Sequence, residues 1–122
     1  MSDRRNRPYD FLERAKMFAI EVRKFMKRLP KHTANFEDIK QLTRSSGAVG
    51  ANYIEANDSL GPKDFRLRLR IARKEAKETA YWLDLIDVGN DTTTEHMRTV
   101  LREEANELLK ILSAMLLKSG DD

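Results

Sequence analysis

The sequence QLTRSSGAVGANYIEAN, residues 41–57, combines helical periodicity with an unusual number of small side chains. Apolar or small residues recur every three or four positions, which is the spacing of one helix face. They are Leu42, Ser46, Val49, Tyr53 and Ala56. The pattern predicts a helix with one side packed into a core.

Two glycines interrupt this predicted helix, Gly47 and Gly50. Each costs about 1 kcal/mol relative to alanine in a helix interior. Small residues allow a second helix to approach, and close packing is the simplest reason for their presence. We therefore expect another helix to pack tightly at these positions.

Polar residues also lie on this helix. Arg44 and Glu55 are eleven positions apart, about three turns, and so share one face. Glu55 could form a carboxylate cluster with Glu75 and Glu78 of the next predicted helix, neutralised by Arg44, Arg73 and Lys74. Such networks can specify helix register. The predicted structural polar network consists of Arg44, Ser45, Asn52, Glu55, Glu75 and Glu78.

Two segments carry a resemblance to a known family: the pattern RSS–VGAN–IEA at residues 44–56, and KDFRLRLRIARKEAKETAYWLDLI at residues 63–86. Across residues 9–117 the chain resembles the four-helix-bundle family encoded in intervening sequences of bacterial 23S ribosomal RNA genes. The resemblance implies a homopentameric ring whose biochemical function is poorly defined. A related branch resembles the accessory subunit of diversity-generating retroelements, a basic ring that works with a reverse transcriptase and nucleic acid.

The periodicity predicts four helices, at about residues 10–29, 35–57, 62–88 and 92–118. Their short connections favour an all-α fold, an antiparallel up-down-up-down four-helix bundle. Residues 9–118 would form this single domain, between a flexible basic arm at 1–8 and a frayed tail at 119–122. Two interpretations of the arm stay open: a terminus without a role, or a contact to nucleic acid.

The third predicted helix has two apolar faces. One continues the core stripe, and the other consists of Leu67, Ile71, Trp82 and Leu85. Two apolar faces on one helix require two packing partners. We therefore predict that the second face is a subunit interface in a ring-shaped homo-oligomer.

Basic residues gather at two places. Arg66, Arg70, Arg73 and Lys77 form a line along the third helix, and Arg23, Lys24, Lys27 and Arg28 lie at the end of the first. The line is either an ordinary solvated face or a set of phosphate contacts. No aromatic residues interleave with these cations, so binding to nucleic acid would be directed at the backbone.

The net charge of +3 is unevenly distributed over the 122 residues. Residues 1–77 contain 19 Lys/Arg and 10 Asp/Glu, a net charge of +9, whereas residues 78–122 contain 4 and 10, a net charge of −6. Either a polyanionic partner or pairing between the two parts explains this asymmetry. The absence of cysteine, of a signal peptide and of a long apolar run leads us to expect a cytoplasmic protein without a membrane span.

The sequence offers little for catalysis. It lacks the Glu-x-x-His pairs of di-metal bundles, and neither His32 nor His96 has a partner at ligand spacing. We expect no catalytic residues, no metal and no cofactor. The predicted function is a non-enzymatic, self-assembling bundle that binds the backbone of RNA or DNA. The alternative is a protein-interaction scaffold or accessory subunit for a nucleic-acid enzyme such as a reverse transcriptase.

Overall fold

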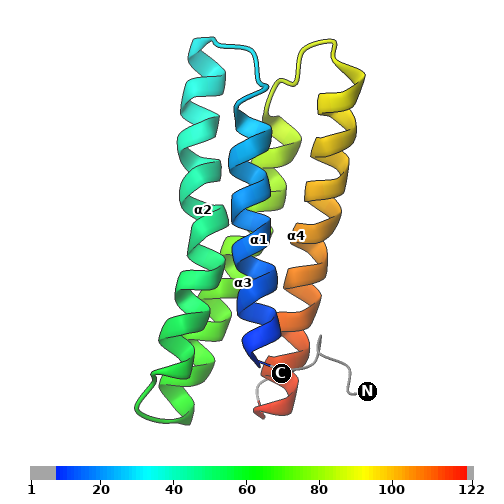
Figure 1. Ribbon diagram of the computed structural model, residues 1–122. Helices are drawn as coiled ribbons and strands as arrows, with labels where there is room; N and C mark the ends of the chain where they lie inside the picture. Colours follow the sequence, from blue (N-terminus) through cyan, green and yellow to red (C-terminus); the bar gives the residue numbers. More distant parts are fainter. Residues whose placement is uncertain (1–7, 121–122) are drawn as a thin grey trace.

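The computed structural model describes residues 8–120, with side chains from residue 11 onward. Within this range it contains four helices and no strand: α1 (Pro8–Met26), α2 (Thr33–Asn57), α3 (Pro62–Leu85) and α4 (Thr92–Lys118). Helices α1 and α3 each pack against α2 and α4 and lie diagonally opposite each other (Figure 1). The prediction of an all-α four-helix fold is confirmed. None of the described helices is long and apolar enough to cross a membrane.

The core consists of one apolar stripe from each helix. Its large, fully buried side chains include Phe11, Val22, Phe25, Leu42, Val49, Tyr53, Leu69, Leu83, Leu108, Leu112 and Leu116. The periodicity of three and four places these residues on one side of each helix, and burying them provides the main driving force for packing.

Helices α2 and α3 approach each other through small polar residues. The hydroxyl of Thr79 donates a hydrogen bond of 2.8 Å to the hydroxyl of Ser45, and both residues are fully buried. Ser46 is fully buried as well. The hydroxyl of Ser46 donates to the carbonyl of Thr43 in its own helix at 3.3 Å. Each of these buried hydroxyls therefore has a hydrogen-bond partner, so the interior can hold them without a large desolvation cost.

The two glycines of α2 serve no such close approach within the chain. A Cβ atom at Gly50 would lie 3.6 Å from Cβ of Ala15, and one at Gly47 would lie 3.5 Å from Nη2 of Arg23. Helix α1 therefore packs beside both glycines, as expected, but at ordinary contact distances that leave room for a methyl group. The hydrogen-bonded contact between small residues instead lies on the face of α2 that carries Ser45 and packs against α3.

Several helix boundaries differ from the expected ones. The first helix begins at Pro8 and ends at Met26, whereas residues 10–29 were expected. Pro30 cannot continue a helix, and Arg28 and Leu29 close it with tighter bonds to the carbonyls three residues back. The third helix ends at Leu85 and not at residue 88. The expected basic arm at 1–8 lies outside the described residues except for Pro8, which is helical.

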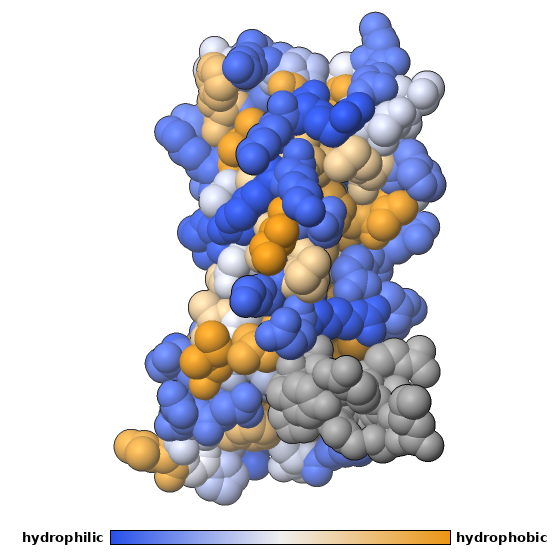
Figure 2. Space-filling model, in the orientation of Figure 1, coloured by the Kyte–Doolittle hydropathy of each residue, from blue (hydrophilic) through white to orange (hydrophobic). Residues whose placement is uncertain are grey.

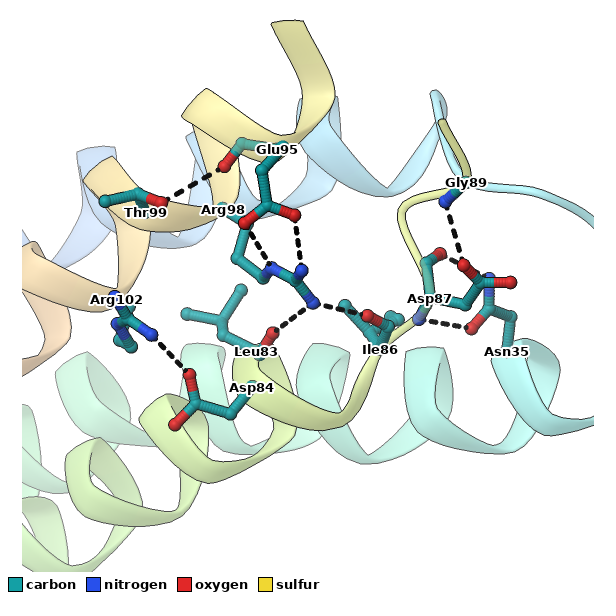
Figure 3. A network of polar contacts seen from close by, with 10 residues as sticks. All are labelled: Asn35, Leu83, Asp84, Ile86, Asp87, Gly89, Glu95, Arg98, Thr99 and Arg102. Atoms are coloured by element: carbon teal, nitrogen blue, oxygen red, sulfur yellow. Dashed lines mark hydrogen bonds and ion pairs between the residues drawn. The ribbon is translucent and has the colours of Figure 1, made fainter. Parts of the chain in front are cut away.

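Asn35 joins two loops at one end of the bundle, shown with its partner Asp87 in Figure 3. Its Nδ2 donates to the carbonyls of Pro30 at 2.9 Å and Asp87 at 2.8 Å. Its Oδ1 accepts from the amide of Asp87 at 3.0 Å. The second helix was expected to begin near residue 35, whereas α2 begins at Thr33 and has His32 as its N-cap.

Candidate nucleic-acid interface

The basic line of α3 lies on the side of the helix that faces α4. Nη1 of Arg73 donates to the hydroxyl of Ser113 at 3.5 Å, and Nη1 of Arg66 donates to the carbonyl of Ser119 at 3.2 Å. Both arginines are half-buried. The spacing of four and three residues along α3 therefore places the line beside α4 and not on the outermost face of the bundle.

A groove of about 540 Å³ opens between these two helices. Its lining residues are Arg70, Arg73, Lys74, Lys77, Leu109 and Ser113. This set contains four cations and no carboxylate. We call it the basic groove. Sequence reasoning did not include Lys74 among the nucleic-acid contacts, although its position next to Arg73 was a usable signal.

The second basic group, at the end of α1, is mostly paired inside the protein. Nη2 of Arg28 donates to Oδ2 of Asp91 at 2.9 Å, and Nζ of Lys24 donates to Oε1 of Glu21 at 3.2 Å. Nη1 of Arg23 donates to a backbone carbonyl of its own helix at 3.0 Å. Because α1 lies diagonally opposite α3, the predicted cations Arg23, Lys24, Lys27 and Arg28 do not extend the basic groove.

The polar network between α2 and α3 is centred on Arg44. Its Nη1 and Nη2 each donate to one oxygen of Glu75 at 3.1 Å, and Nη2 also reaches Oε1 of Glu78 at 3.4 Å. The hydrogen bonds to Glu75 raise the pKa of Arg44, and the charges of both carboxylates add to this effect. Ser45, one residue along, bonds to α3 through Thr79. The network thus joins four of its six predicted members across one helix pair.

Asn52 and Glu55 lie outside this network. Nδ2 of Asn52 donates to the carbonyl of Ala48 at 2.9 Å, within the same helix. Glu55 is exposed and forms no ion pair with another residue in the described range. Eleven residues of helix separate Glu55 from Arg44 by about 16 Å along the axis. The shared face was predicted from spacing, but this distance prevents contact with the same partners.

The second apolar face of α3 is only partly exposed, because Trp82 packs against the core of its own chain. Leu67 is 47% exposed and Leu85 is 50% exposed, whereas Ile71 and Trp82 are half-buried. Tyr81 is 56% exposed and packs edge-on against Trp82, with ring centroids 5.1 Å apart. Sequence reasoning missed Tyr81, although it lies four residues before Leu85 on the same face.

The comparison with known proteins agrees with this architecture. Residues 7–114 match the family described as 23S rRNA-intervening sequence protein. The chain belongs to this family. A solved structure that resembles it is a protein of unknown function from the S23 ribosomal protein family of Bacteroides thetaiotaomicron, with 29% identity and a TM-score of 0.77. The match covers 89% of this chain and 96% of that one. No curated protein matches the chain.

Potentially reactive side chains in this 23S rRNA-intervening sequence protein have structural positions. Nε2 of His32 lies 2.9 Å from Oδ2 of Asp87, at the end of the bundle. Ser45 and Ser46 are fully buried. Among residues 8–120, no three His, Asp or Glu side chains are placed to hold one metal ion.

Proposed function

We propose that this protein is a non-enzymatic, antiparallel four-helix bundle that assembles with copies of itself in the cytoplasm and binds the backbone of RNA or DNA. The family resemblance favours a ring of five copies. The observation that carries the nucleic-acid proposal is the basic groove, whose lining contains four cations and no carboxylate.

The chemistry of the basic groove indicates the kind of contact. Lysine and arginine side chains that neutralise phosphates release condensed counterions, so the affinity falls as the salt concentration rises. No aromatic ring lines the groove, which leaves no platform for base stacking. Contacts to phosphate and sugar position a protein without reading the bases. We therefore expect weak sequence selectivity.

The test compares two charge reversals of equal size. Arg70→Glu with Lys77→Glu changes the basic groove, and Lys24→Glu with Lys27→Glu changes the end of α1 on the diagonal helix. Fluorescence anisotropy with a labelled single-stranded RNA at low salt measures the affinity. The groove variant should lose binding, while the α1 variant should remain within about threefold of the wild type. Unchanged binding by the groove variant would overturn the proposal.

A second candidate function is a scaffold for a nucleic-acid enzyme such as a reverse transcriptase. The supporting observation is a hollow between α1 and α4 that contains Met17 and Val100, 49% and 47% exposed, beside Glu103 and Glu107. Exposed apolar groups with an acidic rim fit a basic protein segment. A tagged protein should then retain such an enzyme after nuclease treatment in moderate salt and release it on Val100→Glu. Capture that depends on nucleic acid would favour the first proposal.

A further inference from the structure

An exposed tyrosine lies directly beyond one end of the basic groove. Tyr81 follows Lys77 by four residues and Lys74 by seven, and these spacings place side chains on the same side of a helix. Lys74 and Lys77 both belong to the lining of the groove, and Tyr81 is 56% exposed. The line of cations on α3 is therefore continued, one turn further on, by an aromatic ring.

The ring of Tyr81 is supported by its neighbour in the chain. It meets the ring of Trp82 edge-on, with an angle of 71° between the ring planes and 5.1 Å between the centroids. Trp82 is half-buried and packs against the core. A ring that is held in this way loses little conformational entropy when a ligand covers it. Tyr81 is thus both accessible and restrained.

Exposure alone does not distinguish Tyr81. Figure 2 shows hydrophobic residues scattered among hydrophilic ones on the face of the bundle that has α1 in front, and isolated exposed residues of this kind are common in globular proteins. Among residues 11–120, two aromatic side chains are more than half exposed, Tyr81 and Phe36. Phe36 lies on α2, beside Lys40, which is paired with Glu37 at 3.3 Å. Tyr81 differs because the basic groove leads up to it.

Two carboxylates lie one turn from Tyr81, and each is paired with an arginine of another helix. Glu78 has Arg44 of α2 at 3.4 Å, and Asp84 has Arg102 of α4 at 2.8 Å. Opposite charges at such distances cancel much of each other's field. These carboxylates therefore repel a phosphate near the ring less than unpaired carboxylates would.

Lys77 lies on the side of Tyr81 from which the groove approaches. Four residues of helix rise by about 6 Å, and a helical side chain leans toward the N-terminal end of its helix. The ring of Tyr81 therefore leans toward Lys77, and one nucleotide can place its phosphate on Lys77 and its base against the ring. Leu85 lies one turn beyond the ring, on the side away from these cations.

An aromatic ring beside a phosphate site favours unpaired bases. The bases of a duplex are paired and stacked on one another, whereas a single strand can splay a base onto an aromatic side chain. Such stacking tolerates every base, because each base has a π face. Phosphate contacts combined with one stacking ring therefore favour single strands without reading a sequence.

We propose that Tyr81 stacks on a base of single-stranded RNA or DNA whose phosphates lie in the basic groove. This inference rests on the nucleic-acid binding proposed above and adds a base contact that the groove itself does not provide. The contact shifts the preference of the protein toward unpaired nucleotides. The stacked base lies at one end of the bound segment, because the groove extends from Tyr81 toward the N-terminal end of α3.

The test separates contacts to bases from contacts to phosphates. Fluorescence anisotropy at low salt compares a short single-stranded RNA, an abasic oligonucleotide of the same length and charge, and a duplex of the same RNA. Tyr81→Leu should bind the single-stranded RNA at least about fivefold more weakly than the wild type does. Its affinity for the abasic oligonucleotide and for the duplex should not change. Tyr81→Phe keeps the ring and should bind all three probes as the wild type does.

The matched control is Phe36→Leu, which removes the other exposed aromatic ring of residues 11–120 and should leave all three affinities unchanged. Urea unfolding and native mass spectrometry check the fold and the assembly of Tyr81→Leu. If this variant binds single-stranded RNA as the wild type does, the groove contacts the backbone alone and the inference is wrong. If it instead changes the state of assembly, the ring belongs to a contact between copies, which also overturns the inference. A wild type that binds none of the three probes would overturn the proposed nucleic-acid binding as well.

Discussion

Arg98 is a residue whose role emerges only in the folded chain (Figure 3). Its Nη1 donates to the carbonyl of Ile86 at 2.6 Å and to that of Leu83 at 3.5 Å, at the end of α3. The guanidinium also pairs with Glu95 on its own helix. Its side chain is only 19% exposed. Arginine satisfies carbonyls that a helix end leaves without partners, and this one does so from a different helix.

We predict that Arg98→Met destabilises the fold by about 2 kcal/mol, because charged hydrogen bonds to buried carbonyls are lost while the apolar stem is kept. The free energy of unfolding of Arg98→Lys should lie between those of Arg98→Met and the wild type. Urea unfolding at one fixed protein concentration measures the effect. The control is Lys110→Met, which removes an exposed pair with Glu107 and should change stability by less than about 0.5 kcal/mol. Equal effects from both variants would show that the carbonyl contacts contribute nothing.

Two aspartates at the loop end of the bundle predict an acid-sensitive region. The hydrogen bond from the amide of Gly89 lowers the pKa of Asp87, and His32 lowers it further. The hydroxyl of Thr94 lowers the pKa of Asp91, and Arg28 adds to that effect. The carboxyl of an unfolded aspartate has a pKa of about 3.9. A folded pKa below that value stabilises the fold above it, and the stabilisation is lost as the pH falls through the folded value.

We therefore expect the melting temperature to change little from about pH 7 to pH 5 and to fall as the pH drops below about 4. The variant with Asp87→Asn and Asp91→Asn should be less stable at neutral pH and should lose less stability on acidification. Circular dichroism melts across this pH range provide the measurement. A double variant with the same acid slope as the wild type would assign the acid response to other carboxylates.

At the scale of the helix, the sequence predicted elements well and their ends poorly. Apolar spacing fixed the faces of all four helices because core packing requires it. The ends depend on contacts from distant parts of the chain: Asn35 bonds the loop that contains Asp87, and Arg98 bonds the end of α3. Local sequence patterns do not reveal such contacts, because the contacts join residues that are far apart in the sequence. The sequence also could not show that α1 lies beside the glycines of α2 at a distance that leaves room for a methyl group.

The glycines give a prediction that separates folding from assembly. Gly47→Ala with Gly50→Ala should raise the free energy of unfolding of the isolated chain by up to about 1 kcal/mol per site. The same methyl groups should weaken assembly if another copy packs over the glycines of α2. Denaturation at low protein concentration and native mass spectrometry measure the two effects.

Gly89→Ala is the matched control for the glycine variant. This residue has a φ of +70°, and an added Cβ would lie 3.2 Å from Cγ of Pro30, so alanine there should destabilise the fold. If the α2 glycine variant is instead destabilised as Gly89→Ala is, the glycines serve intrachain packing and not a contact with another copy.

At the scale of the whole molecule, the unevenly distributed charges form ion pairs within the chain and also line the basic groove. Within the chain, Arg14 pairs with Glu104 at 2.6 Å and Arg28 with Asp91 at 2.9 Å, each across the two oppositely charged parts. The hydrogen bonds to Glu104 raise the pKa of Arg14. Four further cations line the basic groove. The sequence predicted the line on α3, but it could not show that α1 is diagonal to it, because that relation depends on the packing order.

Assembly and nucleic-acid binding make a joint prediction. A ring presents several copies of the basic groove, and a long RNA that occupies two of them binds the second at a high effective concentration. We expect Leu85→Glu, at an exposed position outside the lining of the basic groove, to bind a short oligonucleotide as the wild type does and a long RNA at least tenfold more weakly. Anisotropy titrations with both RNAs at several salt concentrations provide the measurement.

The salt dependence separates this avidity from a direct loss of contacts. The slope of log affinity against log salt scales with the number of phosphates neutralised, about 0.7 per contact for single strands. For the long RNA, the wild type should therefore show a steeper slope than Leu85→Glu. For the short RNA the two slopes should coincide, whereas Arg70→Glu with Lys77→Glu should flatten both. If Leu85→Glu binds long RNA with the affinity and slope of the wild type, each groove acts alone and the ring has another purpose.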